Sequence, residues 1–289
     1  MIGLKRGTVE LCAHEAAWEQ EARDTISRLR QILGSAAKDI QHVGSTAVSS
    51  IKAKPIIDIA VAVERFEDVL ALEGALRDAG FVYRPNAGGG EAGEGHMLFG
   101  CGSFYDGTGD LQTHFIHVVP AGGTAFFNYV HFRDYLNANP EAAREYEALK
   151  EALARQPHPD GARARYLAGK HDFIARTLRR ALLQSYLGKT VTVRIDGPLG
   201  NGPADLEAPV YRGRTPHVAG GEALDVCLLG VHAPGPACRA QIVGVLSHHD
   251  GAGDGLVAAP EGTRPGREEI ARALRMYQAY SADEIEVFA

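Results

Sequence analysis

Residues 42–48 read HVGSTAV and residues 54–63 read KPIIDIAVAV, and these two neighbouring stretches decide the fold. The second stretch predicts a strand, because Ile57 and the alternate apolar residues after it share one face. Asp58 and two alanines share the other face. The first stretch, a run of small residues between periodic segments, predicts a turn just before this strand.

The turn and the strand together have the parts of a phosphate site. Gly44 allows the backbone to approach a ligand closely, and Ser45 and Thr46 offer hydroxyl donors. Asp58 places a carboxylate at strand spacing from the turn. A carboxylate of this kind can hold Mg²⁺ against bound phosphate groups.

Helical periodicity surrounds this centre. Residues 15–33 repeat apolar side chains at intervals of three and four, which predicts an amphipathic helix. Similar patterns predict further helices at residues 66–79, 125–138, 140–156 and 162–186, and alternation predicts a strand at 112–120. This order of elements indicates an α+β domain with helices on a small mixed sheet.

The glycine-rich run AGGGEAGEG, at residues 87–95, has two interpretations. It could cradle a phosphate, or it could be a surface connection. The surface connection is favoured, because no strand leads into the run and no lysine follows it.

The character of the chain changes at Gly188. Short extended runs broken by Gly and Pro follow, and a single helix at residues 266–280 closes the sequence. Frequent short strands with turn signals predict a β-barrel. We therefore expect two domains, residues 1–187 and residues 188–289.

Composition narrows the function. A formal charge of −6 argues against a general nucleic-acid binder, and no basic-aromatic run suggests a nucleic-acid partner. No apolar run is long enough for a membrane span or a secretory signal. The four cysteines are scattered and form no Cys-x-x-Cys pair, so a cytoplasmic protein with reduced thiols is expected.

Several strings resemble the GrpB family, a nucleotidyltransferase-fold family, over roughly residues 3–185. They are HVGSTAV, AKPIIDIAV, HFIHVV, FRDYL and the pair Tyr166 and Lys170. The resemblance implies a Mg²⁺-dependent transfer of a nucleotide, with ATP the expected donor, to a small-molecule acceptor with release of pyrophosphate. It implies catalytic roles for Asp58, also the metal ligand, and for His117. The implied nucleotide- and phosphate-binding residues are Gly44, Ser45, Thr46, Lys54, Arg133, Lys150 and Lys170.

Three of these residues, and also His42 beside the turn, have a structural interpretation as well. Asp58 could cap a strand end, and His117 could be a core histidine with satisfied hydrogen bonds. Arg133 could form a local ion pair with Asp134, and His42 could brace the turn. These alternatives stay open at the level of sequence.

The chain departs from the superfamily pattern at the second metal carboxylate. Ala60 stands two residues after Asp58, where that carboxylate belongs. Glu64, Asp106 and Asp110 are candidates to replace it in space. A protein that binds a nucleotide or phosphometabolite without catalysis is therefore the alternative function. His114 and His117 are three residues apart on the later strand, so one of them faces Asp58, and His117 is favoured.

Residues 189–289 resemble the soluble (family I) inorganic pyrophosphatases, whose fold is a small barrel of the OB type. The matching strings are VTVRIDGPLG, APVYRGRTP, GGEALDVCLLGV and VGVLSHHDGAGDGLVAAP. The resemblance implies a thinned metal set of Glu222, Asp225, Asp250 and Asp254.

Most of the phosphate-binding side chains of that family are absent from this sequence. Gly197 and Gly255 stand where the resemblance implies an arginine and a lysine. We therefore expect a structural barrel without hydrolysis, which could mediate a homo-oligomer, and residual pyrophosphatase activity is the alternative.

Overall fold

This computed structural model describes residues 2–85, 95–155, 162–199, 210–216, 223–247, 254–274 and 284–287. The chain forms two compact units, Met1–Leu178 and Arg179–Ala289. The division falls inside helix α8 (His171–Gln184), earlier than the expected boundary after residue 187. The last turns of α8 therefore belong to the second unit.

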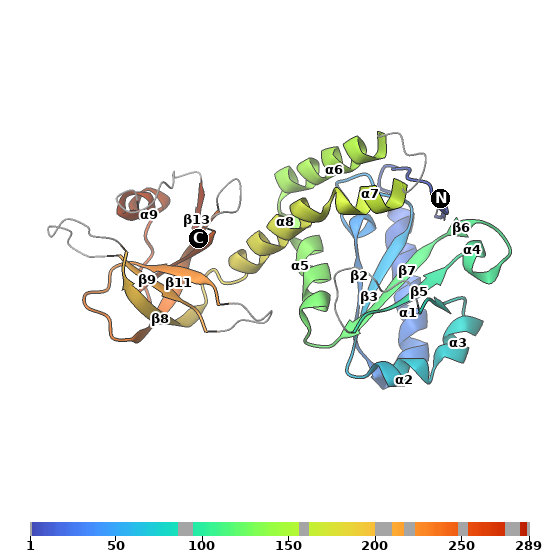
Figure 1. The fold of residues 1–289 in the computed structure, drawn as a ribbon, viewed down its shortest axis with the longest axis horizontal. Coiled ribbons are helices and arrows are strands. Elements are labelled where there is room, and N and C mark those ends of the chain that lie inside the picture. The colour runs from blue at the N-terminus through green and yellow to red at the C-terminus, as the bar shows by residue number, and fades with distance from the viewer. Residues whose placement is uncertain are drawn as a thin grey trace. The chain divides into compact units, whose positions relative to one another are not determined.

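The first unit is built on a five-stranded mixed sheet (Figure 1). β3 and β7 pair in parallel, and the other neighbours are antiparallel. In sheet order the strands are β2 (Ala37–Val43), β3 (Ile57–Val63), β7 (His114–Pro120), β5 (Met97–Cys101) and β4 (Val82–Tyr83). The first unit also contains a separate two-stranded ladder, formed by β1 (Leu4–Lys5) and β6 (Leu111–Gln112), and the short helix α4 (Ser103–Asp106). The predicted α+β architecture with a small mixed sheet is confirmed.

The alternation in β3 sorts its side chains to two faces as expected. Ile57 and Ile59 pack in a core with Trp18 and Leu29 of helix α1 (Ala16–Leu33). The short helices α2 (Phe66–Leu70) and α3 (Glu73–Asp78) add to the same core. Helices α1, α2 and α3 therefore pack on this face of the sheet.

The opposite face of β3 is covered by α5 (Thr124–Ala138). Ala60 and Ala62 pack there against Phe126. Small alanines let α5 approach the sheet closely. Helices α6 (Pro140–Arg155) and α8 pack on α5 through a further apolar cluster, and α7 (Ala162–Ala168) precedes α8.

Two predicted helices are interrupted. Residues 66–79 form α2 and α3 instead of one helix, and residues 162–186 divide into α7 and α8. The second break follows Gly169, where an added Cβ would collide with Leu153 of α6. Gly169 therefore packs closely against α6, and the turn after it presents Lys170.

The second unit contains a closed five-stranded barrel. Strands follow each other around it in the order β12–β10–β9–β8–β11, and β11 pairs again with β12. β10 and β12 are parallel. The strands are β8 (Thr190–Pro198), β9 (Tyr211–Arg214), β10 (Asp225–Leu228), β11 (Ala237–Leu246) and β12 (Gly255–Ala259). β13 (Ile285–Val287) pairs antiparallel with the end of β11, and α9 (Arg267–Leu274) packs on the barrel core.

The predicted barrel with one closing helix is thus confirmed, although nothing in its architecture establishes a pyrophosphatase. The glycine-rich run, apart from Gly95, and the end of the predicted closing helix lie outside the described residues. Within the described ranges, no helix has the length and apolar character that crossing a bilayer requires.

Candidate functional site

The first unit contains a cavity of about 520 Å³ beside the small-residue turn. Its wall combines the turn, three side chains of strands β3 and β7, the inner face of α5, aromatic residues of α6 and α7, and apolar residues of α8. The lining residues are Gly44, Ser45, Thr46, Lys54, Ile56, Asp58, Phe115, His117, Thr124, Ala125, Asn128, Tyr129, Phe132, Tyr146, Tyr166, Leu167, Lys170, Ile174 and Leu178. Of the nine catalytic and nucleotide-binding residues predicted for the first unit, seven therefore line this cavity.

The turn is shaped by Gly44 and Asp58. Gly44 has φ 71° and ψ −170°, a conformation that only glycine adopts readily. A Cβ at this position would also lie 2.6 Å from Oδ2 of Asp58. The backbone can therefore pass over the carboxylate only because residue 44 has no side chain.

Thr46 is held inside the protein rather than presented to a ligand. Its hydroxyl donates to the carbonyl of Ile56 at 3.4 Å, and it therefore accepts from Nε2 of His42 at 3.0 Å. Burial lowers the pKa of His42 to about 4, so His42 is neutral at pH 7. The interpretation of His42 as a brace for the turn fits these contacts. Ser45 is half-buried, and its side chain forms a hydrogen bond with Tyr146.

Asp58 and His117 form a hydrogen-bonded pair at the wall of the cavity. His117 Nε2 lies 3.3 Å from Asp58 Oδ1, and the Tyr129 hydroxyl lies 3.2 Å from His117 Nδ1. A carboxylate can only accept, so Nε2 carries the proton, and Nδ1 accepts from Tyr129 or from Nε2 of His96, which also lies at 3.2 Å. Burial raises the pKa of Tyr129, which keeps this donor protonated. The tautomer of His117 is therefore set from both sides.

His96 is a neighbour of this pair that sequence reasoning missed. Its ring stacks on His117 at 5.3 Å between centroids and 6° between planes. Burial, and then the charge of His117, lowers the pKa of His96 to about 4. No local pattern marks His96, because it follows the glycine-rich run and reaches His117 only through the pairing of β5 with β7.

Two lysines of the cavity converge on one aromatic ring. Lys54 Nζ lies 4.8 Å and Lys170 Nζ lies 4.7 Å from the centroid of the Tyr166 ring. Lys54 is positioned by the bridge between Ala53 and Cys12, whose backbones exchange two hydrogen bonds. Lys170 is positioned by the turn between α7 and α8. Residues that are distant in sequence thereby place two cations on the same side of the cavity.

Lys150 lies behind this wall and does not line the cavity. Its side chain is almost fully buried, and Nζ donates to the carbonyl of Lys52 and sits 4.8 Å from the Tyr146 ring centroid. Burial, and then the charges of Lys170 and Lys54, lowers the pKa of Lys150 to about 7. Lys150 therefore adds to the local positive potential without reaching a ligand directly.

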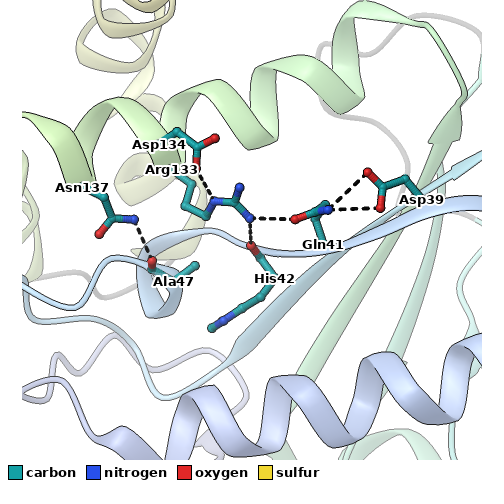
Figure 2. A network of polar contacts seen from close by, with 7 residues as sticks. All are labelled: Asp39, Gln41, His42, Ala47, Arg133, Asp134 and Asn137. Atoms are coloured by element: carbon teal, nitrogen blue, oxygen red, sulfur yellow. Dashed lines mark hydrogen bonds and ion pairs between the residues drawn. The ribbon is translucent and has the colours of Figure 1, made fainter.

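Arg133 also lies away from the cavity wall. Figure 2 shows its guanidinium reaching from α5 to β2, where Nη1 donates to the His42 carbonyl at 2.8 Å and to Gln41 Oε1 at 3.1 Å. Nε donates to Asp134 at 2.7 Å, the local pair considered from sequence. One turn later, Asn137 donates to the Ala47 carbonyl at 3.0 Å. Arg133 thus ties α5 to the strand and turn that form the site, instead of contributing to the cavity lining.

His114 points to the other face of the sheet, as the spacing predicted for one of the two histidines. Its Nε2 lies 3.2 Å from Thr25 Oγ1 and 3.3 Å from Glu21 Oε1, both on α1. Burial lowers the pKa of His114 to about 4. His117, not His114, is the partner of Asp58.

The candidates for a second metal carboxylate lie elsewhere. Glu64 pairs with Lys38, Asp110 pairs with Lys5, and Asp106 accepts from Thr108. Asp58 is the only acid among the described residues that line the cavity, and no cluster of three potential metal ligands exists in the described ranges. Mg²⁺ favours near-ideal octahedral oxygen coordination. One carboxylate already bonded to a histidine fits such an ion poorly.

In the second unit, the acidic residues expected to form a vestigial metal set are placed only in part. Asp225 pairs with Arg214 at 3.2 Å, and Arg214 also approaches Asp196 at 3.8 Å. Asp254 is buried at the start of β12. Glu222 and Asp250 lie outside the described residues. The guanidinium of Arg214 therefore contacts both Asp196 and Asp225.

Comparison with known proteins identifies the family. Residues 8–180 match the family model described as GrpB protein, and the chain belongs to the GrpB family. The glutamate-rich protein GrpB of Alkalihalophilus pseudofirmus is 39% identical over 157 residues, which are 54% of this chain and 87% of that protein. The family match ends before the barrel.

A solved structure of a GrpB protein agrees with this assignment. The crystal structure of the conserved protein GrpB from Enterococcus faecalis superposes with a TM-score of 0.53 at 30% identity, covering 61% of this chain and 99% of that chain. The MgGTP-bound Cid1 poly(U) polymerase gives a TM-score of 0.36 at 15% identity over 52% of this chain and 46% of that one. Agreement as loose as the latter does not establish a shared fold.

Proposed function

We propose that the cavity of the first unit binds a nucleoside polyphosphate. The observation that supports this most strongly is the convergence of Lys54 and Lys170 on one side of a cavity that opens beside the Gly44 turn. Lysines are effective point charges for phosphate groups, and a turn with exposed backbone N–H groups can complete such a site. The polyphosphate therefore lies between the turn and the two lysines.

The rest of the cavity suits a base and a sugar. Phe115, Tyr129 and Phe132 provide aromatic surface, and Asn128 on α5 offers an amide for hydrogen bonding. Stacking of a base on aromatic rings contributes about 1–3 kcal/mol per base. A cavity of about 520 Å³ is in the range of ordinary small-molecule sites.

A thermal-shift screen tests the proposal. ATP, the other nucleoside triphosphates, nucleoside diphosphates and sugar phosphates are added to the full chain, each with Mg²⁺ and with EDTA. Ligand binding to the folded state alone raises the melting temperature. We expect a shift with at least one nucleotide, and a folded protein that responds to none of them contradicts the proposal.

Nucleotidyl transfer to a small-molecule acceptor is the second candidate, with Mg²⁺ and ATP as the expected cofactors. It is favoured by the position of the Asp58–His117 pair beside the turn. There the carboxylate can accept a proton from an acceptor hydroxyl while His117 orients it. Release of pyrophosphate from ATP upon addition of candidate acceptors tests this function, and no release with a protein that binds ATP leaves binding alone.

For the barrel, we propose a pyrophosphatase-like origin without hydrolysis. The proposal is supported by the closed five-stranded architecture and by the pairing of Asp225 with Arg214. A role in forming a homo-oligomer is compatible with it, and the mass of the full chain in solution tests that role.

A further inference from the structure

We infer that phosphate groups bind in this cavity without a divalent cation, with Lys54 and Lys170 supplying the charge that a metal would otherwise supply. This inference rests on the proposed nucleotide binding. It adds that the free polyphosphate binds, rather than its complex with Mg²⁺. Three features of the first unit carry it: the disposition of Asp58, the filled space at Ala60 and the cluster of lysines.

Both oxygens of Asp58 face protein groups. Oδ1 receives the Nε2 proton of His117, and Oδ2 lies against Gly44, as the 2.6 Å approach to an added Cβ shows. A metal ion at Oδ1 would share that oxygen with the hydrogen bond from His117, and the Nε2 proton would lie close to the cation. The contacts of Asp58 are therefore those of a carboxylate that supports the turn and holds a histidine.

The position of a second carboxylate is occupied by core. Ala60 is fully buried and packs with Val43, Val119 and Phe126. Ala60 is also the register partner of His117 on β7. The ring of His117 thus reaches over the small alanine toward Asp58, in the region where paired carboxylates would bind a metal. A charged side chain at residue 60 would be buried among apolar groups.

The lysines provide a positive potential that an anion would relieve. Lys54 and Lys170 share the Tyr166 ring, and their charges are sensed by the buried Lys150, whose pKa they help to lower to about 7. The described lining carries these two lysines and one acid, Asp58. Phosphate oxygens that contact the lysines reduce the repulsion among the ammonium groups without any metal.

Calorimetric titration of the full chain with ATP and with tripolyphosphate, in EDTA and in Mg²⁺ at equal ionic strength, tests the inference. We expect binding in EDTA that is as tight as in Mg²⁺ or tighter, because Mg²⁺ masks phosphate charge. Lys170→Met and Lys54→Met should each weaken binding about tenfold or more in EDTA, which corresponds to about 1.4 kcal/mol. Lys170→Arg should retain most of the affinity. The exposed Lys38→Met is the matched control and should change nothing.

Asp58→Asn separates the two modes of binding. Metal-free binding predicts that Asp58→Asn shifts the affinity by a similar factor in EDTA and in Mg²⁺, because no metal contact is lost. Binding in Mg²⁺ only, or a loss of affinity in Asp58→Asn that is confined to Mg²⁺, overturns the inference while preserving nucleotide binding. Unaltered affinity in folded Lys54→Met and Lys170→Met also overturns it. Absence of binding under both conditions overturns the proposed function as well.

Discussion

The carboxylate of Asp58 occupies the space that a side chain at residue 44 would need, with Oδ2 2.6 Å from the position of a Cβ. Asp58 and Gly44 are adjacent across the β2–β3 ladder, where Val43 is the register partner of Asp58. The turn and the strand are therefore one steric unit, and a change at either residue is felt at both.

Gly44→Ala should destabilise the protein by about 3 kcal/mol, from backbone strain together with the collision with Asp58. Urea unfolding measures this change. Gly7→Ala is the matched control, because Gly7 also has a positive φ of 86° but nothing lies within 4 Å of an added Cβ. It should cost about 1 kcal/mol from strain alone. Equal losses in the two variants would show that the contact with Asp58 has no energetic weight.

Arg133→Met should lower stability rather than nucleotide affinity. The variant leaves the His42 carbonyl and Gln41 without their donor, which costs about 1–3 kcal/mol. Arg144→Met removes an exposed arginine whose ion pair with Glu141 spans 3.9 Å, and it should change stability by less than about 0.5 kcal/mol. Chemical denaturation and ATP titration are measured on both. If Arg133→Met is as stable as the unmodified protein but has lost its affinity for ATP, the result supports the expected contact between Arg133 and phosphate.

Stability should fall as pH is lowered from 6.5 toward 4. Burial lowers the pKa of His42 and His114 to about 4 in the folded chain, so in this window the unfolded chain binds protons that the folded chain does not. Each histidine contributes a slope of about 1.4 kcal/mol per pH unit to the free energy of unfolding. His114→Gln should remove about one such slope in denaturation series at several pH values. His232→Gln, which removes an exposed histidine, is the control, and equal slopes in both variants would refute the assignment.

Leu183 should be needed by the barrel. It is fully buried in the second unit with Val193, Leu228 and Val245, although it belongs to α8. Leu183→Ala should cost about 2–5 kcal/mol. A fragment of residues 179–289 should be more stable to heat than one of residues 188–289, as followed by circular dichroism. Similar melting of the two fragments would place the functional boundary back at residue 187.

The full chain should release almost no phosphate from pyrophosphate in Mg²⁺, compared with an active soluble pyrophosphatase assayed in parallel. Arg214 lies between Asp196 and Asp225, and Gly197 and Gly255 provide no side-chain donor. Arg214→Ala should not restore turnover, since the donors remain absent. Hydrolysis at a rate near that of the comparison enzyme would mean that the acidic residues have been matched to the wrong positions of the pyrophosphatase pattern.

Much of the first unit follows from local patterns. The alternation in β3 predicts which residues contact α1 and which face α5, because a strand has only two faces. The same reasoning separates His114 from His117. Family resemblance, in addition, associates Lys170 with the turn at Gly44, although the two residues are 126 positions apart in the sequence.

Other parts of the site depend on packing that no local pattern encodes. The rotation of α5 decides that Arg133 reaches β2 rather than the cavity, and its neighbour Tyr129 enters the wall instead. Lys150 resembles any surface lysine in sequence, yet it is buried because α6 packs with that face inward. The interruption at Gly169 is set by contact with Leu153 on another helix.

The fully buried Trp18 is the single tryptophan of the sequence, and it lies in the core of the first unit. Its indole emission therefore reports unfolding of the first unit alone, while far-ultraviolet dichroism records both units. Two transitions that differ between these signals would resolve the separate stabilities of the units in one intact chain. The protein thus carries an intrinsic optical probe for which no label has to be introduced.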